Sequence, residues 1–276
     1  MYNEAMDTVA EILENYIRHL RNQTLSQTTA RSYENTVRQF CYFWGLHKDL
    51  FTISERSTEL FMVHLSKEGY STKSLNSKKS AVNNFLDYLS EKYNVSIHYI
   101  SSNSTPKECT ELRLLTEEEI SKLRDLIKND LRSLAIVYLL LYSGIKVGEV
   151  INLKMTDFLL TENKGSLVLK DRTIPLEDLS LKNLLKYLAV RPKSSEANLF
   201  VSASGIPLNI RNLRRQINRY FLKAEINNAT LFDLRHTFCI NKLKSGASIE
   251  EIATVAGHKN LITTQKYLTY INLDAN

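Results

Sequence analysis

The chain has 276 residues, enough for one large or two modest domains, and 43% of them are hydrophobic. No apolar run is long enough to cross a bilayer, and the residues after Met1 lack the basic start and apolar core of a signal peptide. We therefore expect a cytoplasmic protein with no membrane partner. The three cysteines, Cys41, Cys109 and Cys239, are widely spaced, which predicts reduced thiols and no paired-cysteine metal site.

The charge is unevenly distributed along the chain. The net formal charge is +6, from 36 basic and 30 acidic residues. Residues 1–110 hold 12 residues of each sign, whereas residues 111–276 hold 24 basic and 18 acidic residues. A basic excess fits a polyanionic partner such as nucleic acid. The excess is modest, and many basic proteins bind no nucleic acid, so charge alone leaves both possibilities open.

The first 93 residues predict a small helical domain, because apolar residues recur there at three-to-four spacing in four successive segments. These are 7–22, 33–44 after a polar start at 24–28, a short third around Leu60, Val63 and Leu65, and a fourth that begins at Ser71-Thr72 and buries Leu75, Val82, Phe85, Leu86 and Leu89. Four helices with short connections form a bundle.

Four cations lie at or near the expected helix starts of this bundle: Arg31, Lys73, Lys78 and Lys79. Side-chain cations and helix N-termini can both bind backbone phosphates, so these residues form a candidate DNA-binding surface. A solvated charged face is the alternative for any one of them.

Residues 94–113 lose helical periodicity, and the polar run at 101–107 has the composition of a linker. We therefore expect a first domain over 1–93, a linker over 94–113 and a second domain over 114–276. A capping box at 116–119 opens the first helix of this second domain.

The second domain predicts an α+β fold. A helix over about 131–143 is apolar on all sides and should be buried at the domain centre; Lys146 follows it closely. The pattern then changes to period two, which predicts short strands with tight turns. The strands are expected at 158–160, 166–170 and 172–175, with Lys170 at the tip of the last hairpin, and a helix follows over 179–190. The chain as a whole is therefore expected to be mainly α with a small antiparallel sheet.

A further helix, over about 209–224, carries a basic face. Arg211, Arg215 and Arg219 repeat every fourth residue and share one side, with Arg214 beside them, while Leu213, Ile217, Tyr220 and Phe221 lie opposite. This face is the strongest candidate in the chain for contact with a DNA groove or with phosphates. A solvated basic face is again the alternative.

The stretch from Gly257 to Tyr267 indicates the chemistry. Gly257 can end one helix in the left-handed conformation, and Asn260 or Thr263 can cap the next. His258 then lies in the turn, with Tyr267 close to it on the new helix. A tyrosine hydroxyl has a pKa of about 10 and attacks a phosphodiester only where cations bind the phosphate oxygens.

Cations that could serve such a tyrosine lie upstream, at Lys146, Lys170 and Arg235. Arg235 can offer a bidentate fork to two phosphate oxygens and keeps its charge at any working pH. A structural ion pair is the alternative for Arg235, and a structural histidine is the alternative for His258.

With these residues in this order, the chain resembles the tyrosine recombinase (phage integrase) family. The family has an Arg in a Thr-Gly-Leu-Arg-x-x-Glu-like stretch, a Lys on a strand hairpin, His-x-x-Arg, Gly-His and a nucleophilic Tyr. The corresponding segments here are 143–149, Lys170, 232–235, 257–258 and Tyr267, and the segments 26–33 and 70–76 resemble the family's N-terminal domain. The resemblance implies an N-terminal helical core-binding domain and an α+β tyrosine recombinase catalytic domain.

The resemblance also implies site-specific recombination: integration, excision or resolution of a mobile element. Tyr267 would attack phosphorus to form a 3′-phosphotyrosine and release a 5′-hydroxyl, which Lys170 would protonate. Arg235, His258 and Lys146 would stabilise the phosphate, with no cofactor and no metal. The partners implied are double-stranded DNA at a specific site and further copies of the chain, as dimers to tetramers on DNA.

Two positions depart from the family pattern. Lys146 stands where the family has its first Arg; it keeps the charge but loses the planar fork. Loss of one such donor commonly costs about 10²–10³ in rate. Phe232 stands where the family has His and can neither accept a proton nor bind a phosphate oxygen. That role is then vacant, or falls to water or to Lys146.

These departures keep a second hypothesis open, a catalytically impaired DNA-binding or regulatory protein derived from the family. A helical transcription factor outside the family is a third hypothesis, and it leaves the spaced C-terminal motif unexplained. Among the neighbouring residues, Tyr270 is the alternative hydroxyl, Arg172 is the nearest substitute for Lys170, and His236 is expected to pack or to orient backbone.

Overall fold

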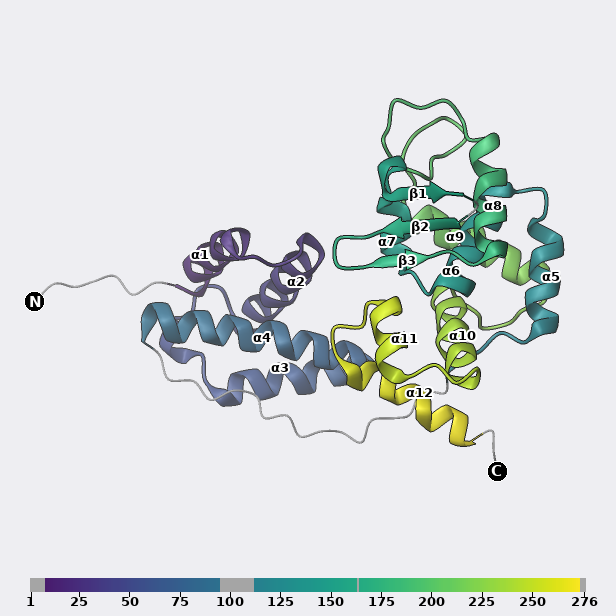
Figure 1. Ribbon diagram of the computed structural model, residues 1–276. Helices are drawn as coiled ribbons and strands as arrows, with labels where there is room; N and C mark the ends of the chain where they lie inside the picture. Colours follow the sequence, from purple (N-terminus) through teal and green to yellow (C-terminus); the bar gives the residue numbers. More distant parts are fainter. Residues whose placement is uncertain (1–7, 95–111, 163, 274–276) are drawn as a thin grey trace, which may run out of the picture. The chain divides into compact units, whose positions relative to one another are not determined.

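The computed structural model describes residues 8–94, 112–162 and 164–273 (Figure 1). The chain divides into two compact units, Met1–Cys109 and Thr110–Asn276, and each is described by itself. The linker expected over 94–113 lies mostly outside the described residues. Within the described parts, no helix combines the length and the apolar character that a membrane span requires.

The first unit consists of helices. They are α1 (Val9–Asn22), α2 (Gln27–Trp44), the short 3-10 helix η1 (Leu50–Thr52), α3 (Glu55–Lys67) and α4 (Thr72–Tyr93). Helices α2 and α4 begin where the sequence predicts, because the hydroxyls of Ser26 and Ser71 accept hydrogen bonds from backbone N–H groups of the first turn. Aromatic rings fill the core; Tyr16 and Phe85 meet edge to face, with ring centroids 4.9 Å apart.

Helix α3 faces the core differently from the sequence pattern. Leu60 and Val63, which mark this helix in the sequence, are 47% and 50% exposed. Leu65, the third of these residues, is buried as expected, and Phe61 joins it on the buried face. A helix this short offers few apolar positions, so its pattern predicts the element but not the side that packs.

The second unit is mostly helical and carries a three-stranded antiparallel sheet, so the predicted fold class is confirmed. Its elements are α5 (Glu117–Ile127), α6 (Leu131–Ser143), α7 (Val147–Asn152), η2 (Met155–Asp157), β1 (Phe158–Thr161), β2 (Lys164–Val168), β3 (Thr173–Pro175), α8 (Asp178–Ala189), α9 (Ile210–Lys223), α10 (Leu231–Lys244), α11 (Ile249–Ala256) and α12 (Leu261–Leu273).

Helix α6 is the centre of this unit and packs against α5, α8 and α10 (Figure 1). Its apolar side chains are buried on nearly every side, as the sequence predicts. The sheet has the order β1-β2-β3, with Leu167 opposite Ile174 and both side chains fully buried. Lys170 lies in the turn between β2 and β3, where the backbone N–H of Leu169 donates to the carbonyl of Arg172.

Candidate active site

The turn before α12 sets the position of Tyr267. Helix α11 ends at Gly257, whose φ of 66° is the left-handed conformation that glycine favours. Asn260, and not Thr263, caps the next helix, because its Oδ1 accepts from the backbone N–H of Ile262 at 2.9 Å. Tyr267 therefore lies on α12 and is only 4% exposed.

The hydroxyl of Tyr267 is held by a histidine. Its Oη lies 2.7 Å from Nδ1 of His236, which comes from α10. The ring of His258 stacks on the tyrosine ring, with centroids 6.2 Å apart and planes 19° apart. Burial, together with the neighbouring Cys239 thiol, raises the pKa of Tyr267, so the resting hydroxyl is protonated.

Arg235 lies beside His236 on α10 and is 8% exposed. Its Nη1 donates to the backbone carbonyl of Gly144, at the end of α6. Gly144 has a φ of 58° and leaves no space for a Cβ, because the ring of Phe238 lies against it. Burial lowers the pKa of Arg235, but a guanidinium remains charged in proteins, so the fold places a fixed cation next to the tyrosine.

His258 is a neutral histidine. Its Nδ1 lies 2.8 Å from the hydroxyl of Thr264, one turn into α12. Burial first, and then the charges of Arg235, Lys146 and Arg172 together with the neighbouring His236 ring, lower its pKa to about 4. At neutral pH the imidazole can therefore act as a hydrogen-bond partner but carries no charge.

Lys146 is held within the site by two contacts. Its Nζ donates to the carbonyl of Gly257 at 2.7 Å and lies 3.4 Å from a carboxylate oxygen of Glu149. The side chain is 41% exposed, so one side of the ammonium group still faces solvent. The lysine thus joins the start of α7 to the turn that carries His258.

Glu149 and Arg172 form a partly buried ion pair that the sequence pattern did not predict. Two guanidinium nitrogens of Arg172 donate to the two carboxylate oxygens at 3.1 and 2.8 Å, and Nε donates to the carbonyl of Val255 at 2.8 Å. Burial opposes ionisation of Glu149, yet the hydrogen bonds from Arg172 and from the Lys146 backbone outweigh it and lower the pKa of the carboxyl. The Arg172 side chain is 6% exposed, so it does not replace Lys170 in contact with substrate.

Lys170 has different surroundings, since it is exposed in the same turn. It lines an open groove of about 1150 Å³ together with Lys146, Lys154 and Lys259. Carboxylates of Glu149, Asp157 and Asp171 line the same groove. The groove therefore brings two of the predicted site lysines, Lys146 and Lys170, to one surface.

The other predicted DNA-binding residues do not belong to this cluster. Arg211, Arg214, Arg215 and Arg219 are all exposed on α9, and the opposite residues Leu213, Ile217 and Phe221 are buried, as the sequence predicts. Phe232 is 51% exposed, with the guanidinium carbon of Arg214 5.4 Å from its ring centre.

The four N-terminal candidates lie in the first unit. Arg31 and Lys73 are exposed, whereas Lys78 and Lys79 are half-buried. Lys78 donates to Gln39 at 2.7 Å and lies over the ring of Tyr70, so part of its charge is used within the bundle.

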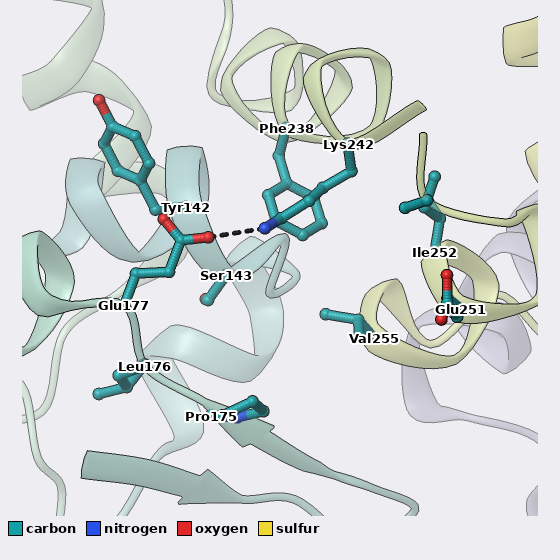
Figure 2. A pocket seen from close by; sticks show the side chains of 11 residues that line it. Tyr142, Ser143, Pro175, Leu176, Glu177, Phe238, Lys242, Glu251, Ile252 and Val255 are labelled. Carbon is teal, nitrogen blue, oxygen red and sulfur yellow. Dashed lines mark hydrogen bonds and ion pairs between the residues drawn. The ribbon is translucent and has the colours of Figure 1, made fainter. Parts of the chain in front are cut away.

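An apolar pocket of about 420 Å³ lies next to the site (Figure 2). Two of its lining residues also contact residues of the site: the Phe238 ring lies against Gly144, and the Val255 carbonyl accepts from Arg172. Lys242 and Glu177 form an ion pair of 2.7 Å at this pocket. Its walls hold none of the predicted site residues. Among the residues that the structure describes, no three His, Cys, Asp or Glu side chains gather in a way that could hold a metal ion.

The structure thus brings Tyr267, Arg235, His258 and Lys146 together and places Lys170 at the adjoining groove. His236, which the sequence favours as a packing residue, instead bonds to the tyrosine hydroxyl. No local signal indicated this contact, because residues adjacent on a helix point in different directions and Tyr267 lies 31 residues away. A tyrosine with cations and neutral imidazoles around it is a site for attack on a phosphate.

Comparison with known proteins agrees with this class of site. Residues 113–271 match the phage integrase family, and residues 13–92 match the N-terminal SAM-like domain of phage integrases. The chain is 32% identical over 269 residues to "Tyrosine recombinase XerA" of Pyrococcus furiosus, covering 94% of this chain and 89% of the relative.

Two solved structures share the fold. One is the Tn1549 transposon integrase in complex with transposon right end DNA, with a TM-score of 0.78, 17% identity and coverage of 94% of each chain. The other is a lambda integrase tetramer bound to a Holliday junction, with a TM-score of 0.76, 15% identity and coverage of 96% of this chain and 78% of that chain.

The chain belongs to the phage integrase family. It is a tyrosine recombinase, an enzyme of site-specific recombination that breaks and rejoins DNA strands.

Proposed function

We propose that Tyr267 is the nucleophile of this recombinase and forms a 3′-phosphotyrosine with DNA. The observation that carries this proposal is the buried Tyr267 hydroxyl, which has His236 at hydrogen-bond distance, the His258 ring stacked on its own and Arg235 nearby. These groups come from α10, the turn after α11, and α12. Such an arrangement gives a phosphate both a nucleophile and fixed donors.

The remaining residues take roles according to their surroundings. Arg235 binds the non-bridging oxygens with its fixed charge, and neutral His258 donates a hydrogen bond to one of them. Lys146 adds a point charge from the start of α7. Lys170, exposed at the groove, protonates the 5′-oxygen as it leaves. Charge neutralisation by these side chains requires neither metal nor cofactor.

DNA is the substrate in this proposal, and basic surfaces bind its backbone. They are Arg211, Arg214, Arg215 and Arg219 on α9, and Arg31, Lys73, Lys78 and Lys79 in the first unit. The Tn1549 integrase was solved with DNA and the lambda integrase as a tetramer on a Holliday junction, which supports DNA binding and self-association here. We propose that residues 94–113 link the helical domain to the catalytic domain. We also propose that the enzyme acts in the cytoplasm.

A catalytically impaired, regulatory protein is the second candidate, and two observations favour it. Nζ of Lys146 is already bound to the Gly257 carbonyl and lies near Glu149. Phe232 offers no polar atom at the position where the family has His.

Covalent trapping separates the two candidates. The protein is incubated with nicked duplexes from the DNA that flanks its own gene, and adducts that survive denaturation are measured. The enzyme reading predicts an adduct in the parent chain that Tyr267→Phe lacks. Binding without adduct in the parent chain, but with adduct in Lys146→Arg, would mean that chemistry is held back at that one position. Binding with no adduct in either would favour the regulatory protein.

A further inference from the structure

A contact on α10 is left unused by these proposed roles. Nδ1 of His236 lies 2.7 Å from Oη of Tyr267, within the usual range for a strong O–H···N hydrogen bond. The two rings are 5.7 Å apart and tilted by 52°, so they meet at their polar atoms without stacking. The contact joins α10 to α12, 31 residues apart in the chain.

We propose that His236 accepts the proton of the Tyr267 hydroxyl as that oxygen attacks phosphorus, and so takes the role for which Phe232 has no group. The inference rests on the proposed function of Tyr267 as nucleophile. It assigns a catalytic part to a residue whose sequence context indicates only packing.

The direction of the hydrogen bond follows from the surroundings of the ring. Burial lowers the pKa of His236, although the charge of Asp233 opposes this, so the imidazole is neutral at pH 7 and has one bare nitrogen. If Nδ1 carried the proton, the phenol hydrogen would be left facing the Cys239 thiol, which is a weak acceptor. A bare Nδ1 that accepts from Tyr267 gives the phenol its better partner.

The helix register explains why His236 can stand in for the missing histidine. Phe232 and His236 are four residues apart on α10 and therefore lie on the same face, one turn from each other. Helical side chains lean towards the N-terminus, which brings the ring of His236 back towards residue 232. Phe232 itself is half exposed and lies beside Arg214.

The other neighbouring histidine is less suited to this step. Nδ1 of His258 is occupied by the Thr264 hydroxyl at 2.8 Å, and its ring lies parallel to the tyrosine ring. Nδ1 of His236, by contrast, already lies at the tyrosine oxygen, where a nitrogen lone pair can take the proton. His258 therefore remains the donor to phosphate, and His236 the acceptor from tyrosine.

The proposed step is balanced in atoms and charge. The Tyr267 Oη–P bond forms as the P–O5′ bond breaks, the phenol proton moves to Nδ1 of His236, and Lys170 gives a proton to the departing 5′-oxygen. Burial raises the pKa of Tyr267 and lowers that of His236, so the proton stays on oxygen at rest. Transfer becomes favourable only as the new O–P bond draws electron density from the phenol oxygen. The hydroxyl proton then becomes more acidic than the protonated imidazole.

A kinetic test uses His236→Asn, whose amide oxygen can accept the hydrogen bond but cannot take the proton. We expect adduct formation to fall by about 10²–10⁴, the usual contribution of a general base. Asn241→Ala, an exposed change on the same helix, should behave like the parent chain. A rate for His236→Asn within about threefold of the parent, or above it, would overturn the proposal.

A substrate with sulfur in place of the bridging 5′-oxygen locates the defect. A thiolate leaves without a proton, since thiols have a pKa of about 8.5. On this substrate Lys170→Ala should regain its rate, whereas His236→Asn should remain slow. Recovery of His236→Asn would assign His236 to the leaving group and so contradict the proposal.

A measurement without DNA keeps the inference separate from the proposed function. In ¹⁵N-labelled protein at pH 7, nitrogen shifts identify which ring nitrogen of His236 carries hydrogen. The proposal requires a bare Nδ1 and a protonated Nε2, with the signal assigned by its loss in His236→Asn. A proton on Nδ1 would overturn it. The proposed function is tested separately, by comparing adduct formation in the parent chain and in Tyr267→Phe.

Discussion

Two parts of the site differ in how firmly the fold holds their side chains. One is the nucleophile pocket around Tyr267 and Arg235, and the other is the lysine groove, lined by Lys146 and Lys170. In the pocket, Tyr267 and Arg235 are nearly fully buried, and each has a hydrogen-bond partner on another element. In the groove, Lys170 is exposed at a turn between two short strands. The surroundings of Tyr267 are thus preorganised, whereas the exposed side chain of Lys170, the proposed general acid, is free to follow a substrate.

The contrast is sharpest within one turn. Arg172 is buried, pairs with Glu149 and bonds to the carbonyl of Val255, whereas Lys170, two residues earlier, faces the groove. Arg172 also fills the space that a Cβ at Gly257 would need. Arg172 therefore holds the segment before His258 in place, whereas Lys170 stays exposed to the groove.

Removing the exposed cation, Lys170, should have the largest effect on the rate of strand cleavage. We expect Lys170→Ala to lower strand cleavage by about 10²–10⁴, because it removes the proposed general acid. Its free energy of unfolding should stay within about 0.5 kcal/mol of the parent, as for other exposed positions. Adduct kinetics and urea unfolding measure the two quantities, with Lys154→Ala in the same groove as the control. A large loss of stability would break the contrast with Arg172.

Removing the buried cation, Arg172, should mainly lower the stability of the fold. Arg172→Ala leaves the Glu149 carboxylate without its bidentate partner, and we expect the free energy of unfolding to fall by about 3 kcal/mol. Urea unfolding measures this loss. The double variant with Glu149→Gln should lose less than the sum of the two single changes, because the unpaired charge is gone. Additive losses would contradict the ion pair.

Stability should also depend on pH through His258. Its pKa is about 4 in the folded chain and about 6.5 when unfolded, so the unfolded state takes up the proton first as pH falls. The stability that this histidine contributes should be present above about pH 6.5 and lost as pH falls towards 4. In thermal unfolding, the advantage of the parent chain over His258→Gln should shrink across this window. A constant difference would contradict a buried, neutral His258.

The smallest effects are expected on the exposed face of α9, whose arginines line neither the surroundings of Tyr267 nor the lysine groove. Changing Arg215 or Arg219 to Ala removes one exposed cation and no packing. Each change should weaken DNA binding about equally for all sequences and reduce the slope of log affinity against log salt by about one. Binding isotherms at several salt concentrations measure this slope. An unchanged slope would show that the face is only solvated.

Local chemistry made part of this site predictable. Gly257 is a residue that commonly ends helices, and the basic face of α9 follows from the spacing of its arginines. Tyr267 and Arg235 belong to short motifs whose residues are close together in the sequence. His236, Glu149 and Arg172 could not be found in this way, because their roles depend on contacts between residues that are 23 to 83 positions apart. Likewise, the sequence allowed Asn260 or Thr263 as the cap, and only backbone geometry distinguishes them.

The role of Tyr267 as nucleophile can be tested by identifying the residue that becomes joined to DNA. After trapping, the DNA is digested and the protein is cut with trypsin, which cleaves after Lys266 and releases the peptide that begins at Tyr267. Fragmentation of that peptide separates Tyr267 from Tyr270. We predict a 3′-linked nucleotide on Tyr267. A nucleotide on Tyr270, or an adduct that persists in Tyr267→Phe, would contradict the account.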